Sequence, residues 1–140
     1  MTEFISKSEK ETQEFAKNFA KTLSRGSVIA FEGDLGAGKT AFTRGLSEGL
    51  GCRDSVSSPT FAIVNEYDGE IPLFHFDMYR IETFSELYSI GFFEYLERGG
   101  ICAIEWSENI YSALPDDSIF VSIEKISENE RKITVTEGKE

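Results

Sequence analysis

Hydrophobic residues recur with a helical period near the N-terminus and form short continuous runs further along the chain. After a short strand over residues 3–6, the pattern predicts a helix over residues 8–24, because its apolar residues fall on one helical face. Ser8 and Glu11 have the spacing of a capping box, which favours a helix start at this point. Gly26 is expected to end the helix in a left-handed conformation. The apolar face consists of Phe15, Ala16, Phe19, Ala20 and Leu23.

Two apolar runs predict buried strands, SVIAFE over residues 27–32 and ICAIEW over residues 101–106. A second helix is expected over residues 40–50, directly after the segment that follows the first of these strands. Its apolar residues recur four apart, and the glycine at position 51 should end it. These apolar residues are Phe42, Leu46 and Leu50.

The middle of the chain carries an antiparallel signal. Residues 61–67 and 71–77 are both rich in β-forming residues, and the segment between them contains Asp68-Gly69. An Asp-Gly pair between two such runs is a strong hairpin signal. An antiparallel ribbon is therefore expected to interrupt a chain that otherwise has an α/β pattern.

Two short helices and a C-terminal pair of strands complete the predicted elements. Thr83 and Glu86 have the spacing of a capping box before a helix through about residue 90. A glycine then separates this helix from a second one over residues 92–98. Residues 118–136 alternate apolar and polar side chains, which predicts two strands joined near residues 128–129.

Composition narrows the function. The chain has 140 residues and a net charge of -11, from 25 acidic and 14 basic residues. This length fits a single domain over residues 1–140. The excess of acidic residues argues against autonomous nucleic acid binding, which needs a basic surface.

The sequence also predicts a cytoplasmic protein. No apolar run reaches the roughly 20 residues of a membrane span, and the N-terminus lacks the apolar core of a secretory signal. Cys52 and Cys102 lie far apart in sequence, so free thiols in a reducing compartment are expected. The single histidine, His75, excludes zinc clusters built on histidines.

The segment GDLGAGKT matches the Walker A pattern of a phosphate-binding loop, and it has the required context of a strand before it and a helix after it. Its glycines let phosphate approach the backbone, where N–H groups and the helix N-terminus form an anion site. Lys39 is expected to reach the β- and γ-phosphates, and the Thr40 hydroxyl to bind Mg²⁺. The predicted nucleotide-binding residues here are Gly33, Asp34, Leu35, Gly36, Ala37, Gly38, Lys39, Thr40 and Ala41.

Two carboxylates are candidates for the metal and for catalysis. Asp77 ends the apolar run LFHFD, and Glu105 ends ICAIE. A P-loop enzyme needs a carboxylate near Mg²⁺, usually at the end of a neighbouring apolar strand. Either residue could bind Mg²⁺ directly, bind it through water or orient the attacking water, and the sequence does not assign these roles.

Four further side chains leave alternatives open. Thr60, in the segment SSPTF, either senses the γ-phosphate and Mg²⁺ as a switch residue or starts a strand after a proline turn. His75 is expected to pack or hydrogen-bond beside its strand, with a catalytic role as the lesser alternative. Trp106 belongs either to the core or to a partly exposed surface for the nucleotide or a partner. Arg80 either stabilises phosphate charge or forms an exposed salt bridge.

Together, GDLGAGKT, SSPTF, HFDMYR and IEW, in this order, resemble the TsaE family (formerly YjeE), the small bacterial P-loop ATPases of the tRNA threonylcarbamoyladenosine (t6A) pathway. Walker A occurs in many families, whereas its combination with the three later motifs is far more specific. The resemblance covers nearly the whole chain. It implies a three-layer α/β fold of the P-loop NTPase type, with a mostly parallel central sheet extended by antiparallel strands.

The resemblance also implies a function. Family members bind ATP and ADP with Mg²⁺ and hydrolyse ATP slowly when alone. They associate with the TsaB–TsaD heterodimer, in which TsaD transfers the threonylcarbamoyl group to the adenosine next to the anticodon. Hydrolysis supports repeated cycles of that complex, so tRNA is met only indirectly through it.

Carried over residue by residue, the resemblance places Thr40 as a Mg²⁺ ligand and Thr60 as the switch-like threonine. It assigns the aspartate of H-x-D to Asp77 and the glutamate of E-W to Glu105, a position associated with Mg²⁺ and hydrolysis. It also places the start of the first helix, around Glu9, near the nucleotide base.

Two other functions stay open. A small P-loop kinase would use the same loop, but such enzymes are usually larger and have an arginine-rich lid that this sequence lacks. A binding module gated by nucleotide without hydrolysis would have the same sequence features. Partner binding that survives in a hydrolysis-dead variant would favour the module, and a phosphorylated product would favour the kinase.

Overall fold

The computed structural model describes residues 1–33, 38–53 and 63–139, and within them the strands form one mixed sheet. The strands are β1 (Thr2–Ser6), β2 (Val28–Gly33), β3 (Val64–Tyr67), β4 (Leu73–Asp77), β5 (Ile101–Glu105), β6 (Ile119–Lys125) and β7 (Arg131–Glu137). Their order across the sheet is β1-β7-β6-β2-β5-β4-β3. The central strands β6, β2, β5 and β4 are parallel, whereas β3 pairs antiparallel at one edge and β7 and β1 pair antiparallel at the other. The predicted α/β class, with a parallel centre and antiparallel extensions, is confirmed.

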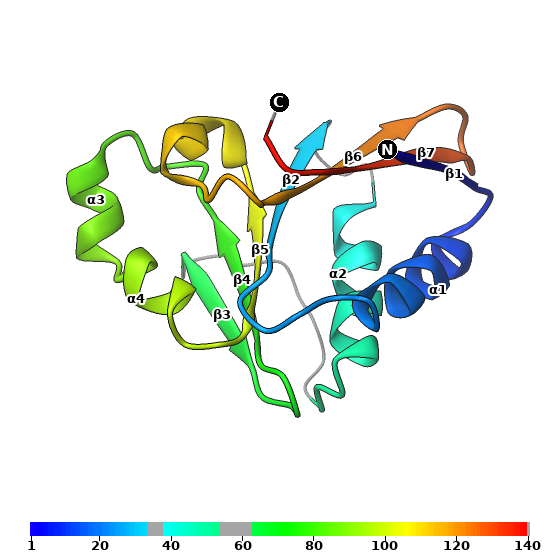
Figure 1. Cartoon of the computed structure of the whole chain (residues 1–140). Helices are drawn as coiled ribbons and strands as arrows, with labels where there is room; N and C mark the ends of the chain where they lie inside the picture. The colour runs from blue at the N-terminus through cyan, green and yellow to red at the C-terminus, as the bar shows by residue number, and fades with distance from the viewer. Residues whose placement is uncertain (34–37, 54–62, 140) are drawn as a thin grey trace.

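Helices cover both faces of this sheet (Figure 1). One face carries α1 (Glu9–Ala20) and α2 (Lys39–Gly49), and the other carries α3 (Phe84–Ser89), α4 (Phe92–Leu96) and the 3₁₀ segment η1 (Ser107–Ala113). Among the helices in the described ranges, none combines the length and apolar character needed to cross a membrane.

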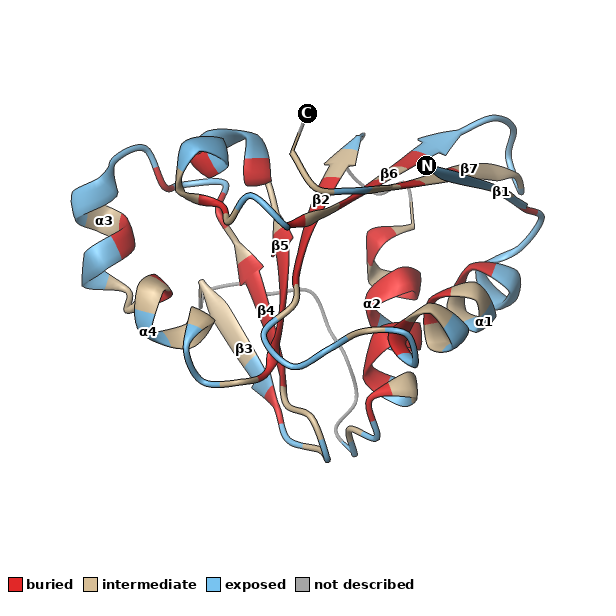
Figure 2. Ribbon diagram, in the orientation of Figure 1, coloured by how far each residue is buried: buried red, intermediate tan, exposed pale blue. Residues whose placement is uncertain are grey.

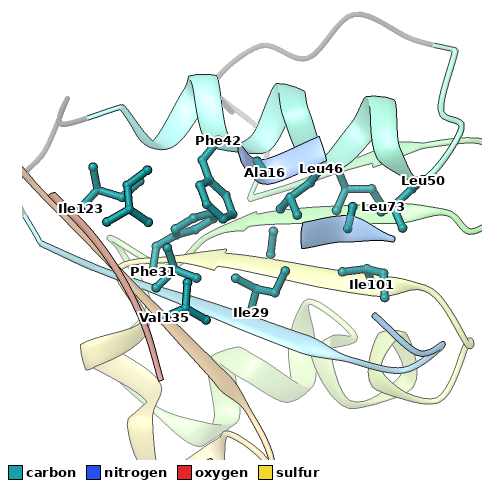
Figure 3. Packing of buried hydrophobic residues seen from close by; sticks show 14 of the residues in the cluster. Ala16, Ile29, Phe31, Phe42, Leu46, Leu50, Leu73, Ile101, Ile123 and Val135 are labelled. Atoms are coloured by element: carbon teal, nitrogen blue, oxygen red, sulfur yellow. The ribbon is translucent and has the colours of Figure 1, made fainter. Parts of the chain in front are cut away.

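The central strands are buried on both sides, which explains why their sequences are nearly continuous apolar runs. Along β2, Ile29 and Phe31 join the core beneath α1 and α2, whereas Val28 and Ala30 join the core beneath α3, α4 and η1. Figure 2 shows that burial is concentrated in these strands and along α2. In Figure 3, Phe42 of α2 lies over Phe31, and the two rings meet edge to face with centroids 5.6 Å apart.

Both predicted capping boxes lie at helix starts. The Ser8 hydroxyl accepts a hydrogen bond from the Glu11 N–H at 3.1 Å, and the Thr83 hydroxyl accepts one from the Glu86 N–H at 3.2 Å. In the first helix the Glu11 carboxylate bonds the N–H of Lys7 and not that of Ser8. Each cap satisfies one of the backbone donors that a helix start leaves unpaired.

The prediction that the first helix runs to residue 24 was wrong. The helix ends at Ala20, and Gly26, although its φ is +89°, lies beyond the end and does not terminate it. The Thr22 hydroxyl donates to the Phe19 carbonyl at 2.7 Å, and the Thr22 N–H bonds the same carbonyl in a tighter 3₁₀ pattern. Local hydrogen bonds of this kind compete with continuation of an α-helix.

The β3–β4 hairpin is confirmed, but its connection is longer than an Asp-Gly turn. Tyr67 pairs with Leu73, so residues 68–72 form the loop. A Cβ atom on Gly69 would lie 2.8 Å from the backbone nitrogen of Cys52, so this loop packs closely against the end of α2. Tertiary packing therefore sets the loop length. The predicted start of this hairpin, residues 61–62, lies outside the described residues.

Close packing of α1 against α2 depends on two glycines. Gly45 and Gly49 lie one helical turn apart on α2 and face Ala16 and Ala20 of α1. A Cβ atom on Gly45 would lie 2.6 Å from the Ala16 Cβ and would overlap the carbonyl oxygen of Gln13. Because this oxygen belongs to the backbone of α1, no side-chain rotation can relieve the overlap.

We therefore expect Gly45→Ala to destabilise the protein, by about 1–3 kcal/mol as is typical of overpacking, even though alanine is the better helix former. Chemical denaturation measures the change in the free energy of unfolding. Arg44→Ala, at an exposed neighbouring position of α2, is the control and should change stability little. A Gly45→Ala protein as stable as the wild type would contradict this view of the helix contact.

Candidate functional site

The predicted site residues that the structure describes gather at the carboxyl ends of the parallel strands. Gly33 ends β2, Asp77 ends β4 and Glu105 ends β5. Asp77 and Glu105 are register partners, and β5 lies directly between β4 and β2. In open α/β sheets, ligands bind at the carboxyl ends of the strands.

Gly33 and Gly38 of the predicted phosphate loop each have a structural reason to be glycine. Gly33 has a φ of +110°, and a Cβ atom there would lie 2.7 Å from the carbonyl oxygen of Ile123 on β6. Gly38 has a φ of +109° and occupies the N-cap of α2. Because Gly38 has no side chain, it gives no capping hydrogen bond, and the N-terminus of α2 keeps backbone donors for an anion.

Lys39 places a positive charge at the carboxyl ends of the parallel strands. The residue is only 5% exposed, and its ammonium group donates to the Gly33 carbonyl at 3.3 Å. The same nitrogen lies 5.8 Å from the centre of the Trp106 ring, within the range of a cation–π contact. A buried ammonium is costly without an anionic partner, so the arrangement is suited to a phosphate group.

Trp106 is held in an unusual backbone conformation beside Lys39. In the described part of the chain it is the one non-glycine residue with a positive φ, at +60°. Such a conformation costs of order 1–3 kcal/mol and persists only when the surroundings impose it. The Trp106 side chain is half-buried and packs on the exposed ring of Tyr79, with centroids 4.9 Å apart.

Hydrogen bonds on either side of Trp106 tie the three strand ends together. The buried Ser107 hydroxyl donates to the Phe31 carbonyl of β2 at 3.0 Å, and the Asn109 amide donates to the Met78 carbonyl at 2.8 Å. The Met78 N–H in turn bonds the Glu105 carbonyl at 3.0 Å. Sequence reasoning missed Ser107 and Asn109, because no local pattern shows that these side chains reach the ends of other strands.

The sole histidine lies against the Glu105 carboxylate. Its Nε2 atom is 2.7 Å from the Glu105 Oε2 atom, and the histidine is 1% exposed. The prediction that His75 packs or hydrogen-bonds beside its strand is confirmed.

The oxygen-bearing side chains at the carboxyl ends of the strands are of the kind that binds a magnesium ion. Thr40, Asp77 and Glu105 offer a hydroxyl and two carboxylates, which are the oxygen ligands that Mg²⁺ prefers. Among the residues that the structure describes, no three His, Cys, Asp or Glu side chains form a protein-only metal cage. Mg²⁺ does not need one, since it usually takes one or two carboxylates and completes its shell with waters and substrate phosphates.

A cavity of about 240 Å³ lies next to the start of α2. Glu9 and Ala41, both predicted to bind the nucleotide, line it together with residues from the β6–β7 connection. The structure thus brings the start of α1 and the first turn of α2 to one hollow.

The remaining predicted residues divide into two groups. Arg80 is exposed and forms no ion pair with any residue in the described ranges, so the salt bridge weighed for it is absent there. The predicted residues Asp34, Leu35, Gly36, Ala37 and Thr60 lie outside the described residues.

Comparison with known proteins identifies the family. The family model described as "Threonylcarbamoyl adenosine biosynthesis protein TsaE" matches residues 6–133. The chain belongs to the TsaE family. It is 46% identical over 127 residues to the TsaE protein of Bacillus subtilis, covering 90% of this chain and 79% of that protein. It is 36% identical to the TsaE protein of Treponema pallidum, covering 94% and 97% of the two chains.

A solved structure has the same fold. The crystal structure of Bacillus subtilis YdiB superposes with a TM-score of 0.81 at 36% sequence identity, covering 99% of this chain and 86% of that one. The family and fold expected from GDLGAGKT, SSPTF, HFDMYR and IEW are therefore confirmed.

Glu32 directly precedes the predicted phosphate loop of this TsaE-family protein. Its side chain lines a cavity of about 220 Å³ on the η1 side of the sheet, with Tyr111 and Phe120. Burial raises the pKa of the Glu32 carboxyl above its ordinary value of 4.5, and the nearby negative charge of Glu108 raises it further.

A raised carboxyl pKa means that the folded protein binds this proton more tightly than the unfolded chain. The stabilising contribution of Glu32 is therefore complete below pH 4.5 and is lost as the pH rises through the pKa of the folded state.

We expect Glu32→Gln to raise the thermal midpoint at pH 7 and to lose this advantage below pH 4. Glu108→Gln is the control and should give a smaller gain in the same direction. An equal gain from Glu32→Gln at both pH values would contradict this electrostatic account.

Proposed function

We propose that this TsaE-family protein is a Mg²⁺-dependent ATPase of the t6A modification machinery, acting as one domain over residues 1–140. It binds ATP and ADP, hydrolyses ATP slowly alone and acts with the TsaB–TsaD heterodimer. The observation that carries the proposal is the buried Lys39 ammonium between the Gly33 carbonyl and the Trp106 ring, at the strand ends where Asp77 and Glu105 are paired.

The phosphates are assigned to the start of α2. Lys39 would bind the β- and γ-phosphates, while backbone N–H groups of the first helical turn bind the remaining oxygens. The helix macrodipole adds roughly half a positive charge at the same point. This local charge explains how a protein with a net charge of -11 binds a polyanion.

The metal is assigned to Thr40, Asp77 and Glu105. When bound, Mg²⁺ would neutralise charge on the phosphates and on the leaving group. The Thr40 hydroxyl is one ligand. Asp77 and Glu105 share the two remaining roles, holding the ion directly or through water and orienting the attacking water.

The base is assigned to the hollow beside Glu9 and Ala41. This cavity of about 240 Å³ lies beside the first turn of the helix that would hold the phosphates, as one bound nucleotide would require. Thr60 remains the proposed switch residue, and Asp34, Leu35, Gly36 and Ala37 remain the proposed backbone of the phosphate loop.

TsaB–TsaD is the proposed partner because the family resemblance implies it, and the acidic composition fits this role. The excess of 25 acidic over 14 basic residues fits a subunit that meets tRNA only through the complex. The exposed Tyr79 ring packs on Trp106, and Arg80, the next residue in the chain, is also exposed, so we assign the partner contact to this surface.

We expect purified protein to hydrolyse Mg·ATP slowly and to turn over faster when TsaB–TsaD is added. Lys39→Ala should abolish turnover in both settings while the protein stays folded, as a cooperative thermal melt would show. Phosphate release measures the rate, and Lys21→Ala, an exposed lysine on the surface, is the matched control. Unchanged turnover in Lys39→Ala would remove the proposed mechanism.

The same assay separates the carboxylates. Asp77→Asn and Glu105→Gln should each lower the rate by at least about tenfold, as removal of a metal ligand or general base typically does. A shift in the Mg²⁺ concentration for half-maximal rate would mark the direct ligand. Glu97→Gln, at an exposed position that is not part of the proposed site, is the control.

The assay also distinguishes the alternatives. Tight ATP binding without turnover, alone and with TsaB–TsaD, would favour the nucleotide-gated binding module. Phosphoryl transfer to an added acceptor instead of water would favour the kinase.

A further inference from the structure

His75 is the buried partner of the Glu105 carboxylate. His75 does not line the hollow beside Glu9, and within the described residues its only hydrogen bond goes to Glu105. We propose that His75 is a positioning residue that fixes the Glu105 carboxylate for Mg²⁺-dependent hydrolysis. This inference rests on the role proposed above for Glu105.

The sheet places the two side chains on the same face. Residues of β4 alternate, so Leu73 and His75 face the α2 side while Phe74 and Phe76 face the opposite core. On β5, Ala103 lies opposite His75 in the register, and Glu105 lies two residues further on. The small side chain of Ala103 leaves room for the imidazole to reach diagonally across to the carboxylate.

The hydrogen bond has a defined direction. A carboxylate oxygen only accepts hydrogen bonds. The His75 Nε2 atom therefore carries a proton and donates a hydrogen bond to Oε2 of Glu105, 2.7 Å away. The other ring nitrogen, Nδ1, is buried and has no hydrogen-bonding partner among the described residues. An aliphatic side chain would fill this place without leaving a buried nitrogen unpaired, so packing alone does not explain a histidine here.

The bond restricts a flexible side chain at the point where chemistry is proposed. Glutamate has several rotatable bonds, and the Glu105 side chain is only 14% exposed, so little water can take the place of His75. The bond uses Oε2, and Oε1 is the oxygen that we assign to the ion or the attacking water. Loss of His75 should therefore lower kcat more than it weakens nucleotide binding, which depends mainly on Lys39 and the loop.

The single histidine allows a direct test on the unmodified protein. With any histidine tag removed, every imidazole signal in a long-range ¹H–¹⁵N NMR spectrum comes from His75. We expect a proton on Nε2, with a downfield signal that moves upfield in Glu105→Gln. A proton on Nδ1 with none on Nε2, or a spectrum unchanged in Glu105→Gln, would overturn the proposal.

Variants then test the consequence for hydrolysis. We expect His75→Leu to lower kcat by about 10- to 100-fold, as loss of a residue that orients a metal ligand typically does, with an ADP affinity within about threefold of the wild type. His75→Gln keeps a donor at similar reach and should recover most of kcat. Thermal melts check that each variant is folded. A His75→Leu kcat within twofold of the wild type, or an equal loss of kcat in His75→Gln and His75→Leu, would contradict positioning.

A double-variant cycle separates positioning from a general structural effect. The loss of kcat that His75→Leu causes should disappear when Glu105→Gln is already present, because no carboxylate is then left for the histidine to position. Additive losses would overturn the proposal. A wild type that binds Mg·ADP but shows no turnover in any setting would count against the ATPase function, while the imidazole spectrum would still decide whether His75 holds Glu105.

Discussion

The Lys39 ammonium group lies inside an acidic protein, 5% exposed, against the Gly33 carbonyl and the face of the Trp106 ring. Neither a carbonyl dipole nor an aromatic ring neutralises a cation, so this position remains costly until an anion arrives. The features around it can be understood from this constraint. The glycine at position 33 allows the close approach of β6, and the glycine at the N-cap of α2 leaves backbone donors directed at the same place.

Carboxylates near such a site need fixed positions, and the structure provides them with bonds between strands. Ser107 ties η1 to β2, Asn109 ties it to the end of β4, and the Met78 N–H ties β4 to β5. The strained backbone of Trp106 lies within this set of bonds, and His75 restrains the Glu105 carboxylate from below the surface. Side chains held in this way lose little further entropy when a ligand binds, which favours a preorganised site.

Much of the fold, and the placement of Asp77 and Glu105 at strand ends, could be predicted from sequence, because the signals are local. The loop GDLGAGKT, the apolar runs that end in Asp77 and Glu105, and both helix caps each depend on residues close together in the chain. The remaining features depend on contacts between distant residues. Thr22 ends the first helix early through a hydrogen bond to Phe19. The β3–β4 loop is longer than an Asp-Gly turn because Gly69, within it, packs on Cys52. The bonds of Ser107 and Asn109 join segments up to 76 residues apart in the chain, and no sequence pattern contains that information.

The central claim is that one nucleotide lies with its phosphates on Lys39 and its metal between Thr40 and the ends of β4 and β5. A crystal structure of the protein with Mg²⁺ and a non-hydrolysable ATP analogue tests it most directly. The account predicts that the β- and γ-phosphates contact Lys39, that the metal binds the Thr40 hydroxyl with Asp77 or Glu105 directly or through water, and that the base lies beside Glu9 and Ala41. A nucleotide bound elsewhere, or phosphates away from Lys39, would contradict it.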